Sequence, residues 1–289
     1  MVKFKKIFGQ SVIWLVLILM YLPILLIILF SFAGPESKAI GDWGEAGTQG
    51  LQLYVNLFQD IEIMSALGNT MIIALVSSII ATLIGTTGAM GVYYFKRRKM
   101  KAVVEGVNQV PVVNAEIVTA LSLTVFFVAL SSLFFHADLF GFWTLLAGHL
   151  VLTVPFVYLN VKPKLMQMDP SLYEAALDLG CSSRVALWKI VIPEILPGIL
   201  SGFLIAFTLS LDDFVITAFT RGPGLLNGNG NIETLSTLIQ SKIKRGAVPP
   251  EMRALTGIIF ATVVCVVTAI SARRYIKAKR NVKKSRGVR

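Results

Sequence analysis

The chain alternates between long apolar runs that contain no charged residue and shorter polar segments. Six such runs are long enough, or nearly so, to cross a hydrocarbon core, which takes about 20 helical residues. We expect six membrane-spanning helices, at residues 10–33, 66–95, 113–135, 141–161, 195–220 and 252–275. The pattern therefore predicts an all-α membrane protein with a single transmembrane domain over residues 1–289.

One polar segment, Asp169 to Pro197, lies between two of these runs and does not have the pattern of a loop. Leu172, Ala176 and Leu179 recur at helical spacing on one side, while Glu174 lies on another. This spacing predicts an amphipathic helix within the longer polar stretch, residues 162–194.

The ends of this helix carry their own signals. Asp169 or Ser171 can cap its start, and Ser171 with Glu174 has the pattern of a capping box. Gly180 can end it in a left-handed conformation.

A second helix is expected to follow, capped by Ser182 or Ser183. Pro193 and Pro197 are expected to mark a turn into the next apolar run. By composition alone, such a helix pair is typical of helices that lie on a membrane surface.

Basic residues are distributed unevenly between alternate segments, and this predicts the orientation in the membrane. Of the 27 Lys and Arg residues, 21 fall at the N-terminus, around residues 96–101, in the polar stretch 162–194 and in the C-terminal segment from Arg273. Cytoplasmic segments carry the excess of basic residues, so both termini and the polar stretch are expected in the cytoplasm. The basic tail, 276–289, is expected to anchor the chain near anionic lipid.

Composition excludes several other classes of protein. With 55% hydrophobic and 15% charged residues, the chain is too apolar for an ordinary soluble domain. Its net charge is +11, but the basic residues lie beside the apolar runs, and this argues against nucleic acid as a partner. The sequence has no phosphate-binding G-x-x-x-x-G-K-[ST] pattern and no H-E-x-x-H pattern, and its two histidines are thirteen residues apart. We expect no cofactor in this chain. If ATP is used, another chain must hydrolyse it.

Two adjacent carboxylates, Asp212 and Asp213, interrupt the fifth apolar run, where an acidic residue costs about 2.5 to 3.5 kcal/mol on insertion scales. Either can face a substrate pathway, cap a half-helix that begins near Phe214, or pair with a basic residue of a partner chain. Glu116, at the cytoplasmic start of the third run, is a further pathway candidate that can also stay hydrated.

Small residues recur every four positions in the second run, at Ala81, Gly85 and Ala89. Such a face allows another helix to approach closely. No internal duplication is evident, so we expect any two-fold symmetry to come from a partner subunit.

The polar stretch resembles the EAA motif of ABC-importer permeases at positions with fixed spacing. They are Glu174-Ala175-Ala176, Gly180, Ile190 and Pro193, with Ile192 where the family most often has Leu. The resemblance implies a type I permease fold of six helices, in which the first short helix is a coupling helix that docks on a cytoplasmic ATPase subunit.

The resemblance covers nearly the whole chain and extends to PotC-type permeases of spermidine/putrescine importers. It is carried by Asn69-Thr70, Gly141-Phe142-Trp143, Pro155-Phe156-Val157, Ser210-Leu211-Asp212-Asp213-Phe214 and Gly222-Pro223. It implies a PotB-type permease partner, two PotA-type ATPase subunits that bind ATP and Mg, and a PotD-type extracytoplasmic binding protein.

A polyamine carries several ammonium groups, so a pathway with carboxylates and apolar walls suits it. Three alternatives stay open. The last outer segment carries the basic residues Lys242, Lys244 and Arg245, which would repel a polycation. The substrate can therefore be another solute, such as an amino-acid derivative or a phosphonate. A proton-coupled transporter that uses the Asp pair would leave the polar stretch unexplained, and an intramembrane enzyme lacks a nucleophile and base at usable spacing.

Overall fold

The computed structural model describes residues 2–32, 48–135, 140–222, 232–244 and 250–262, with 264, 265 and 268, and within them it contains helices and no strand. Four of the described helices are long and apolar enough to cross a membrane, namely Ile61–Tyr94, Glu116–Leu133, Phe142–Gln167 and Ser183–Asp212. The first expected span falls in α1 (Val2–Ser31), which contains the shorter apolar helix Gln10–Pro23. The sixth lies partly, and the basic tail wholly, outside the described residues.

The chain divides into two compact units. The first consists of the terminal segments Met1–Met64 and Lys242–Arg289. In it, α2 (Thr48–Gln59) is followed by Asp60, whose Oδ1 accepts hydrogen bonds from the amides of Glu62 at 2.9 Å and Ile63 at 3.1 Å. Asp60 thus caps the start of the next helix. Lys242 Nζ lies 2.7 Å from Glu62 Oε2.

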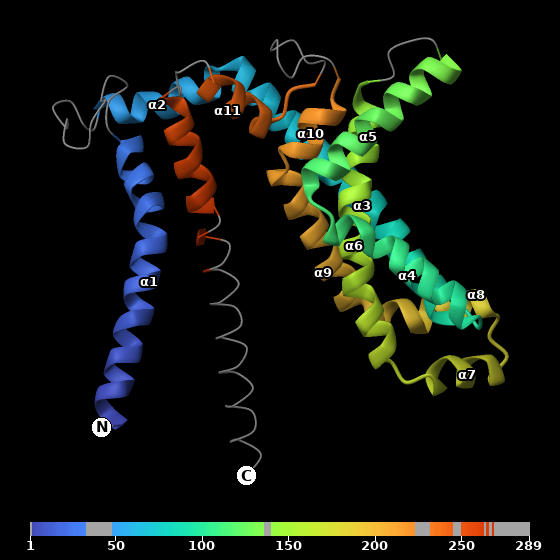
Figure 1. The fold of residues 1–289 in the computed structure, drawn as a ribbon. Helices are drawn as coiled ribbons and strands as arrows, with labels where there is room; N and C mark the ends of the chain where they lie inside the picture. Colours follow the sequence, from blue (N-terminus) through green and yellow to red (C-terminus); the bar gives the residue numbers. More distant parts are fainter. Residues whose placement is uncertain are drawn as a thin grey trace. The chain divides into compact units, whose positions relative to one another are not determined.

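The second unit, Ser65–Ser241, contains the long helices and the sites described below. Within it, α6 packs along α9, α10 lies against α5 and α6, and α4 lies against α6 (Figure 1). The bounds of its helices are α3 Ile61–Tyr94, α4 Arg98–Val113, α5 Glu116–Leu130, α6 Phe142–Gln167, α7 Ser171–Asp178, α8 Ser183–Ala186, α9 Ile192–Asp212, α10 Val215–Thr220 and α11 Leu235–Lys244.

Three helices meet closely around Val157 of α6. A Cβ atom built on Gly85 of α3 would lie 2.8 Å from the Val157 side chain, and one on Gly202 of α9 would lie 3.2 Å from its Cα. Ala81 and Ala89, one turn on either side of Gly85, are buried in the same core. The small-residue face predicted in the second apolar run is confirmed as a helix-packing surface.

The helix α4 was not expected from the sequence. Val103 and Val107 are exposed, whereas Val104 packs against the core and Glu105 Oε1 lies 2.8 Å from Lys162 Nζ of α6. The helix α4 thus presents exposed valines on one side and is attached to α6 by an ion pair on another.

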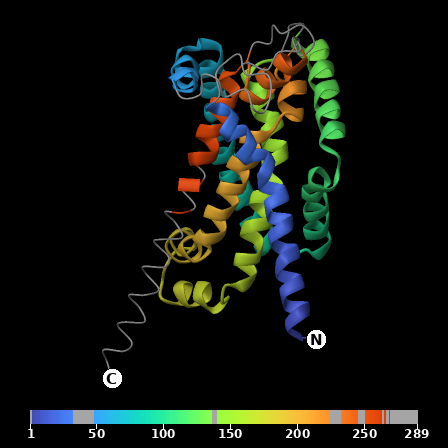
Figure 2. The same ribbon diagram turned by 90° about the vertical axis from the view of Figure 1, so that its left-hand side faces the viewer.

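The prediction that Pro193 and Pro197 mark a turn was wrong, because a continuous helix runs from Ser183 to Asp212 through both of them. A π-helical turn, Leu187–Val191, joins α8 to α9 directly before Pro193, and such a turn shifts the backbone hydrogen bonds at the point where the proline has no N–H to donate. The fourth helix also extends to Gln167, beyond the expected end at 161. In both views α7 and α10 lie at opposite ends of α6 (Figures 1 and 2).

Candidate functional site

The fifth apolar span is broken where its two carboxylates lie. The helix α9 ends at Asp212, Asp213 is extended with ψ 128°, and α10 starts at Val215 after a further non-helical residue, Phe214, with φ −113°. Helix ends leave backbone groups without intrahelical partners, so a break inside an apolar span requires other groups to satisfy them.

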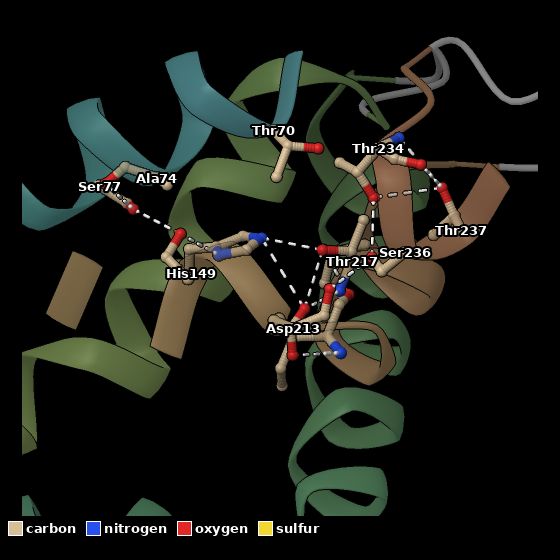
Figure 3. Close-up of polar contacts among 12 residues, drawn as sticks. Thr70, Ala74, Ser77, His149, Asp213, Thr217, Thr234, Ser236 and Thr237 are labelled. Carbon is tan, nitrogen blue, oxygen red and sulfur yellow. Dashed lines mark hydrogen bonds and ion pairs between the residues drawn. The ribbon is translucent and has the colours of Figure 1, made fainter. Parts of the chain in front are cut away.

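Asp213 supplies these partners at the start of α10. Its Oδ1 accepts a hydrogen bond from the amide of Ile216 at 3.2 Å, and its Oδ2 accepts from the amide of Thr217 at 2.7 Å and from the Thr217 hydroxyl at 2.8 Å (Figure 3). The side chain is buried. Asp213 is therefore a helix cap, one of the roles that the sequence left open.

A buried histidine of α6 lies beside this cap. His149 Nε2 is 3.0 Å from Thr217 Oγ1 and 3.9 Å from Asp213 Oδ2, and His149 Nδ1 is 2.8 Å from Ser210 Oγ of α9 (Figure 3). Ser210 Oγ in turn lies 2.9 Å from Ser77 Oγ of α3. One polar chain therefore links α3, α9, α6 and α10.

The direction of these hydrogen bonds follows from the carboxylate. An ionised Asp213 only accepts, so the Thr217 hydroxyl donates to it and must itself accept from an Nε2–H of His149. In neutral imidazole the other nitrogen, Nδ1, is then an acceptor for the hydroxyl of Ser210. The chain of contacts thus assigns the tautomer of His149.

Hydroxyl groups also hold the side of the break that is next to α11. Ser236 Oγ donates to the carbonyl of Asp213 at 2.7 Å, and Thr70 Oγ1 accepts from the amide of Leu235 at 2.8 Å (Figure 3). Asn69 Nδ2 donates to the carbonyl of Glu233 at 3.0 Å. The pair Asn69-Thr70, which the sequence singled out, therefore fixes the start of α11.

The far end of α10 is held separately. Thr144 Oγ1 of α6 donates to the carbonyl of Thr220 at 2.9 Å, and Thr124 Oγ1 of α5 donates to that of Phe219, also at 2.9 Å. Every turn of this short helix is thus bonded to a neighbouring segment.

Asp212 differs from its neighbour, since it is exposed at the end of α9. Glu116 is exposed in the first turn of α5, one turn before Ala120, which packs against Ile216 of α10. The structure thus separates the three candidate carboxylates into one buried cap and two open groups. No cluster of three or more potential metal ligands occurs among the described residues.

His149, Thr217 and Ser77 were not singled out by the sequence analysis. A lone histidine in an apolar run is a weak signal. The two hydroxyls that contact it, those of Ser210 and Thr217, lie 61 and 68 residues away in the chain, and only the fold brings them together. The break after Asp212, by contrast, was signalled by the carboxylates themselves.

The second candidate site is the pair of short helices α7 and α8, called the helix pair below, at the other end of α6. Gly180 adopts φ +84°, and the amides of Gly180 and Cys181 donate to the carbonyls of Leu177 at 2.9 Å and Ala176 at 3.0 Å. This is the left-handed end that the sequence predicted. Glu174 and Ala175 are exposed on α7, whereas Ala176 is buried.

The start of α7 differs from one of the expectations. Ser171 is the first helical residue and so cannot form the predicted capping box. Asp169 takes over this role, since its Oδ1 accepts from the Ser171 amide at 3.0 Å. This bond and a second one from the Ser171 hydroxyl lower the pKa of the Asp169 carboxyl.

The helix pair exposes a set of large apolar side chains although it lies in a polar stretch of the chain. Ring contact between Tyr173 and Tyr94, with centroids 5.3 Å apart, attaches α7 to the end of α3. Ile190 is half-buried and Pro193 is exposed beyond it. The exposed apolar side chains on the pair are Leu172, Leu177, Leu179, Val185 and Trp188.

A bundle of apolar helices with a broken span, a polar interior and an exposed helix pair at one end defines a multi-pass membrane transport protein. Residues 81–281 match the family described as binding-protein-dependent transport system inner membrane component, and the chain belongs to this family.

Named relatives cover nearly the whole chain. It is 34% identical over 245 residues to the putrescine transport system permease protein PotI of Escherichia coli (strain K12), covering 84% of this chain and 82% of PotI. It is 33% identical over 263 residues to the spermidine/putrescine transport system permease protein PotC of the same strain, covering 91% and 92%.

The fold matches a crystal structure of a bacterial ABC transporter involved in the import of the acidic polysaccharide alginate. The TM-score is 0.69 at 17% sequence identity, with 93% of each chain covered. The predicted all-α fold of an ABC-importer permease is confirmed.

Proposed function

We propose that this chain is a permease subunit of an ATP-driven importer of polyamines and forms half of the translocation pathway. The observation that carries the substrate assignment is the open carboxylate of Asp212 at the break in the fifth span. The names of the relatives, which transport putrescine and spermidine, support the same substrate class.

The placement of the other charges supports a cationic cargo. Asp212 and Glu116 are open, so they can meet ammonium groups, whereas Asp213 is occupied as a cap. Lys242, one of the basic residues that left room for an anionic solute, is paired with Glu62. Pairing reduces the repulsion that this lysine would exert on a cation.

The helix pair is proposed to couple the permease to ATP hydrolysis by a partner chain. Exposed Glu174 and Ala175, the fixed turn at Gly180, and Ile190 and Pro193 beyond it are the residues assigned to this contact. The exposed apolar side chains on the pair fit a protein partner, because large apolar patches outside the membrane mark interaction sites.

The complete transporter is proposed to contain a PotB-type permease, two PotA-type ATPases that bind ATP and Mg, and a PotD-type binding protein. Both termini and the helix pair are placed in the cytoplasm on the distribution of basic residues. Closure of the ATPases moves α7, and the permease pair switches from inward-facing to outward-facing to receive its substrate.

Orientation is tested with single cysteines in a background that lacks Cys181 and Cys265. A cysteine at exposed Ile61 should react with a membrane-impermeant thiol reagent added outside, and one at exposed Asp169 should not. The reverse pattern would overturn the orientation and the coupling role with it.

The substrate assignment is tested on the complete complex in proteoliposomes. Spermidine and putrescine should stimulate ATP hydrolysis in the presence of the binding protein, whereas amino-acid derivatives and phosphonates should not. Asp212→Asn should reduce spermidine transport more than putrescine transport, because spermidine has one more charge to compensate. Equal transport of both by the variant would remove Asp212 from the pathway.

A further inference from the structure

We infer that His149 is a positioning residue that fixes the break between α9 and α10 and thereby directs Asp212 into the pathway. The inference rests on the proposed function, since it assigns Asp212 to a cationic cargo. His149 itself does not touch the cargo, because it is 1% exposed.

The break needs such a constraint. Between Asp212 and Val215 the chain leaves helical geometry, so the direction of α9 relative to α10 depends on the dihedral angles of Asp213 and Phe214. The hydrogen-bond ladder that makes a helix rigid is interrupted there. Side chains must therefore hold the two segments in a fixed orientation.

His149 is bonded on both sides of the break. Its Nδ1 lies 2.8 Å from Ser210 Oγ, before the break, and its Nε2 lies 3.0 Å from Thr217 Oγ1, after it. The imidazole is a rigid ring with two nitrogens, so it sets the separation between the two hydroxyls. Thr144 and Thr124 hold only the far end of α10.

The contact with Ser210 determines where Asp212 points. Residues two apart in a helix point about 200° away from each other around its axis. Because Ser210 is 3% exposed and faces His149, Asp212 is turned to the opposite, open side of α9. If α9 rotates after the hydrogen bond to His149 is lost, the Asp212 carboxylate no longer points into the pathway.

Ser77 of α3 supports this arrangement from a third helix. Its Oγ lies 2.9 Å from Ser210 Oγ, so the hydroxyl that meets His149 is held from both sides. The next residue, Ser78, donates only to a carbonyl of its own helix, that of Leu75, at 3.0 Å. The neighbouring serines thus form a matched pair for mutation.

The experiment measures initial rates of spermidine uptake against concentration in cells that express the complete transporter, with the amount of this chain in the membrane determined in parallel. Asp212→Asn and His149→Leu should each raise KM about tenfold and change the maximal rate per complex by less than about twofold. In the double variant, KM should rise no further than in either single variant, because both act through one carboxylate.

A conservative variant separates positioning from burial. In His149→Gln the amide can donate to Thr217 and accept from Ser210, so KM should stay within about twofold of the parent. Ser77→Ala should raise KM by a few-fold, whereas Ser78→Ala should not. If His149→Leu fails to accumulate, Ser210→Ala removes the same hydrogen bond from the side of α9. It then takes the place of His149→Leu in the comparison of single and double variants with Asp212→Asn.

A second readout does not depend on the cargo. In a background without Cys181 and Cys265, Asp212→Cys should react with a small thiol reagent at a rate that changes several-fold on adding His149→Leu but not on adding His149→Gln. Three results would each overturn the positioning role. They are an unchanged labelling rate with His149→Leu, a normal KM of His149→Leu with less protein in the membrane, and a KM in the double variant that rises by the product of the two single effects. A normal KM for Asp212→Asn together with a changed labelling rate would instead refute the proposed cargo contact alone.

Discussion

Asp212 and Asp213 are neighbours in the chain, yet one carboxylate is exposed and the other accepts three hydrogen bonds inside the protein. The helix ends between them, so their side chains belong to different structural contexts. Substitutions at the two positions should therefore affect different properties of the transporter.

Replacement of Asp213 should reduce stability and leave substrate selectivity unchanged. Asp213→Ala removes the acceptors for Ile216 and Thr217, and loss of a cap costs about 1 kcal/mol or more. Asp213→Asn keeps one oxygen and should lie between the parent and the alanine variant. Thermal unfolding of the purified complex measures this order. A selective loss of spermidine transport in a fully stable Asp213→Asn complex would contradict it.

Gly180→Val should impair coupling, because a β-branched residue at φ +84° costs about 1 to 3 kcal/mol and would displace the end of α7. Gly180→Asn is the matched control, since Asn tolerates this conformation. The measurement is ATP hydrolysis stimulated by the loaded binding protein, at equal amounts of inserted chain. Full stimulation with valine would show that the turn does not orient the helix.

Glu174→Ala should weaken contact with the ATPase without lowering the stability of the permease, because Glu174 is exposed on α7. Asp178→Ala, also exposed on the same helix, is the control for a general loss of charge. Co-purification of the ATPase with each variant distinguishes them. Equal losses in both variants would argue for a charge effect and against a specific contact at Glu174.

Gly85→Ala should destabilise the helix core, whereas Gly88→Ala should not. A Cβ at position 85 would lie 2.8 Å from Val157, but one at position 88 meets no atom within 4 Å. Overpacking of this kind typically costs about 1 to 3 kcal/mol, while alanine at an open helical site is slightly favourable. Thermal unfolding of the two variants side by side provides the comparison. Equal stability would show that the helices separate at no cost.

The cap at Asp169 should hold at neutral pH and fail only in strong acid. Hydrogen bonds from Ser171 lower its pKa below the ordinary 3.8, so their stabilising contribution is complete above that value and is lost as pH falls through the lower, folded-state pKa. The carboxyl ¹³C shift of labelled Asp169, compared with a peptide of residues 165–180, measures the difference. Identical midpoints would mean that the bond is absent in solution.

The sequence was sufficient for features that depend on local pattern. Apolar runs located the four long apolar helices among the described residues, Gly180 located the end of α7, and the spacing of Ala81, Gly85 and Ala89 identified a packing face. Each of these follows from helix geometry within one segment, and the family resemblance supported the fold as a whole.

Features that depend on competing local signals or on distant contacts were missed. Pro193 and Pro197 were interpreted as a turn because the sequence does not reveal the π-helical turn that accommodates them. The helix α4 was missed because the ion pair between Glu105 and Lys162, which attaches it to α6, joins segments that are distant in the chain. His149 became significant only through partners on other helices.

The break after Asp212 also has an electrostatic polarity of its own. Peptide dipoles add along α9, so its C-terminal end carries a partial negative charge of about half an electron at the break. The opposing positive end of α10 is already neutralised by the Asp213 carboxylate. The C-terminal end of α9 therefore contributes an attraction for cations that comes from the backbone and does not depend on the charge of Asp212.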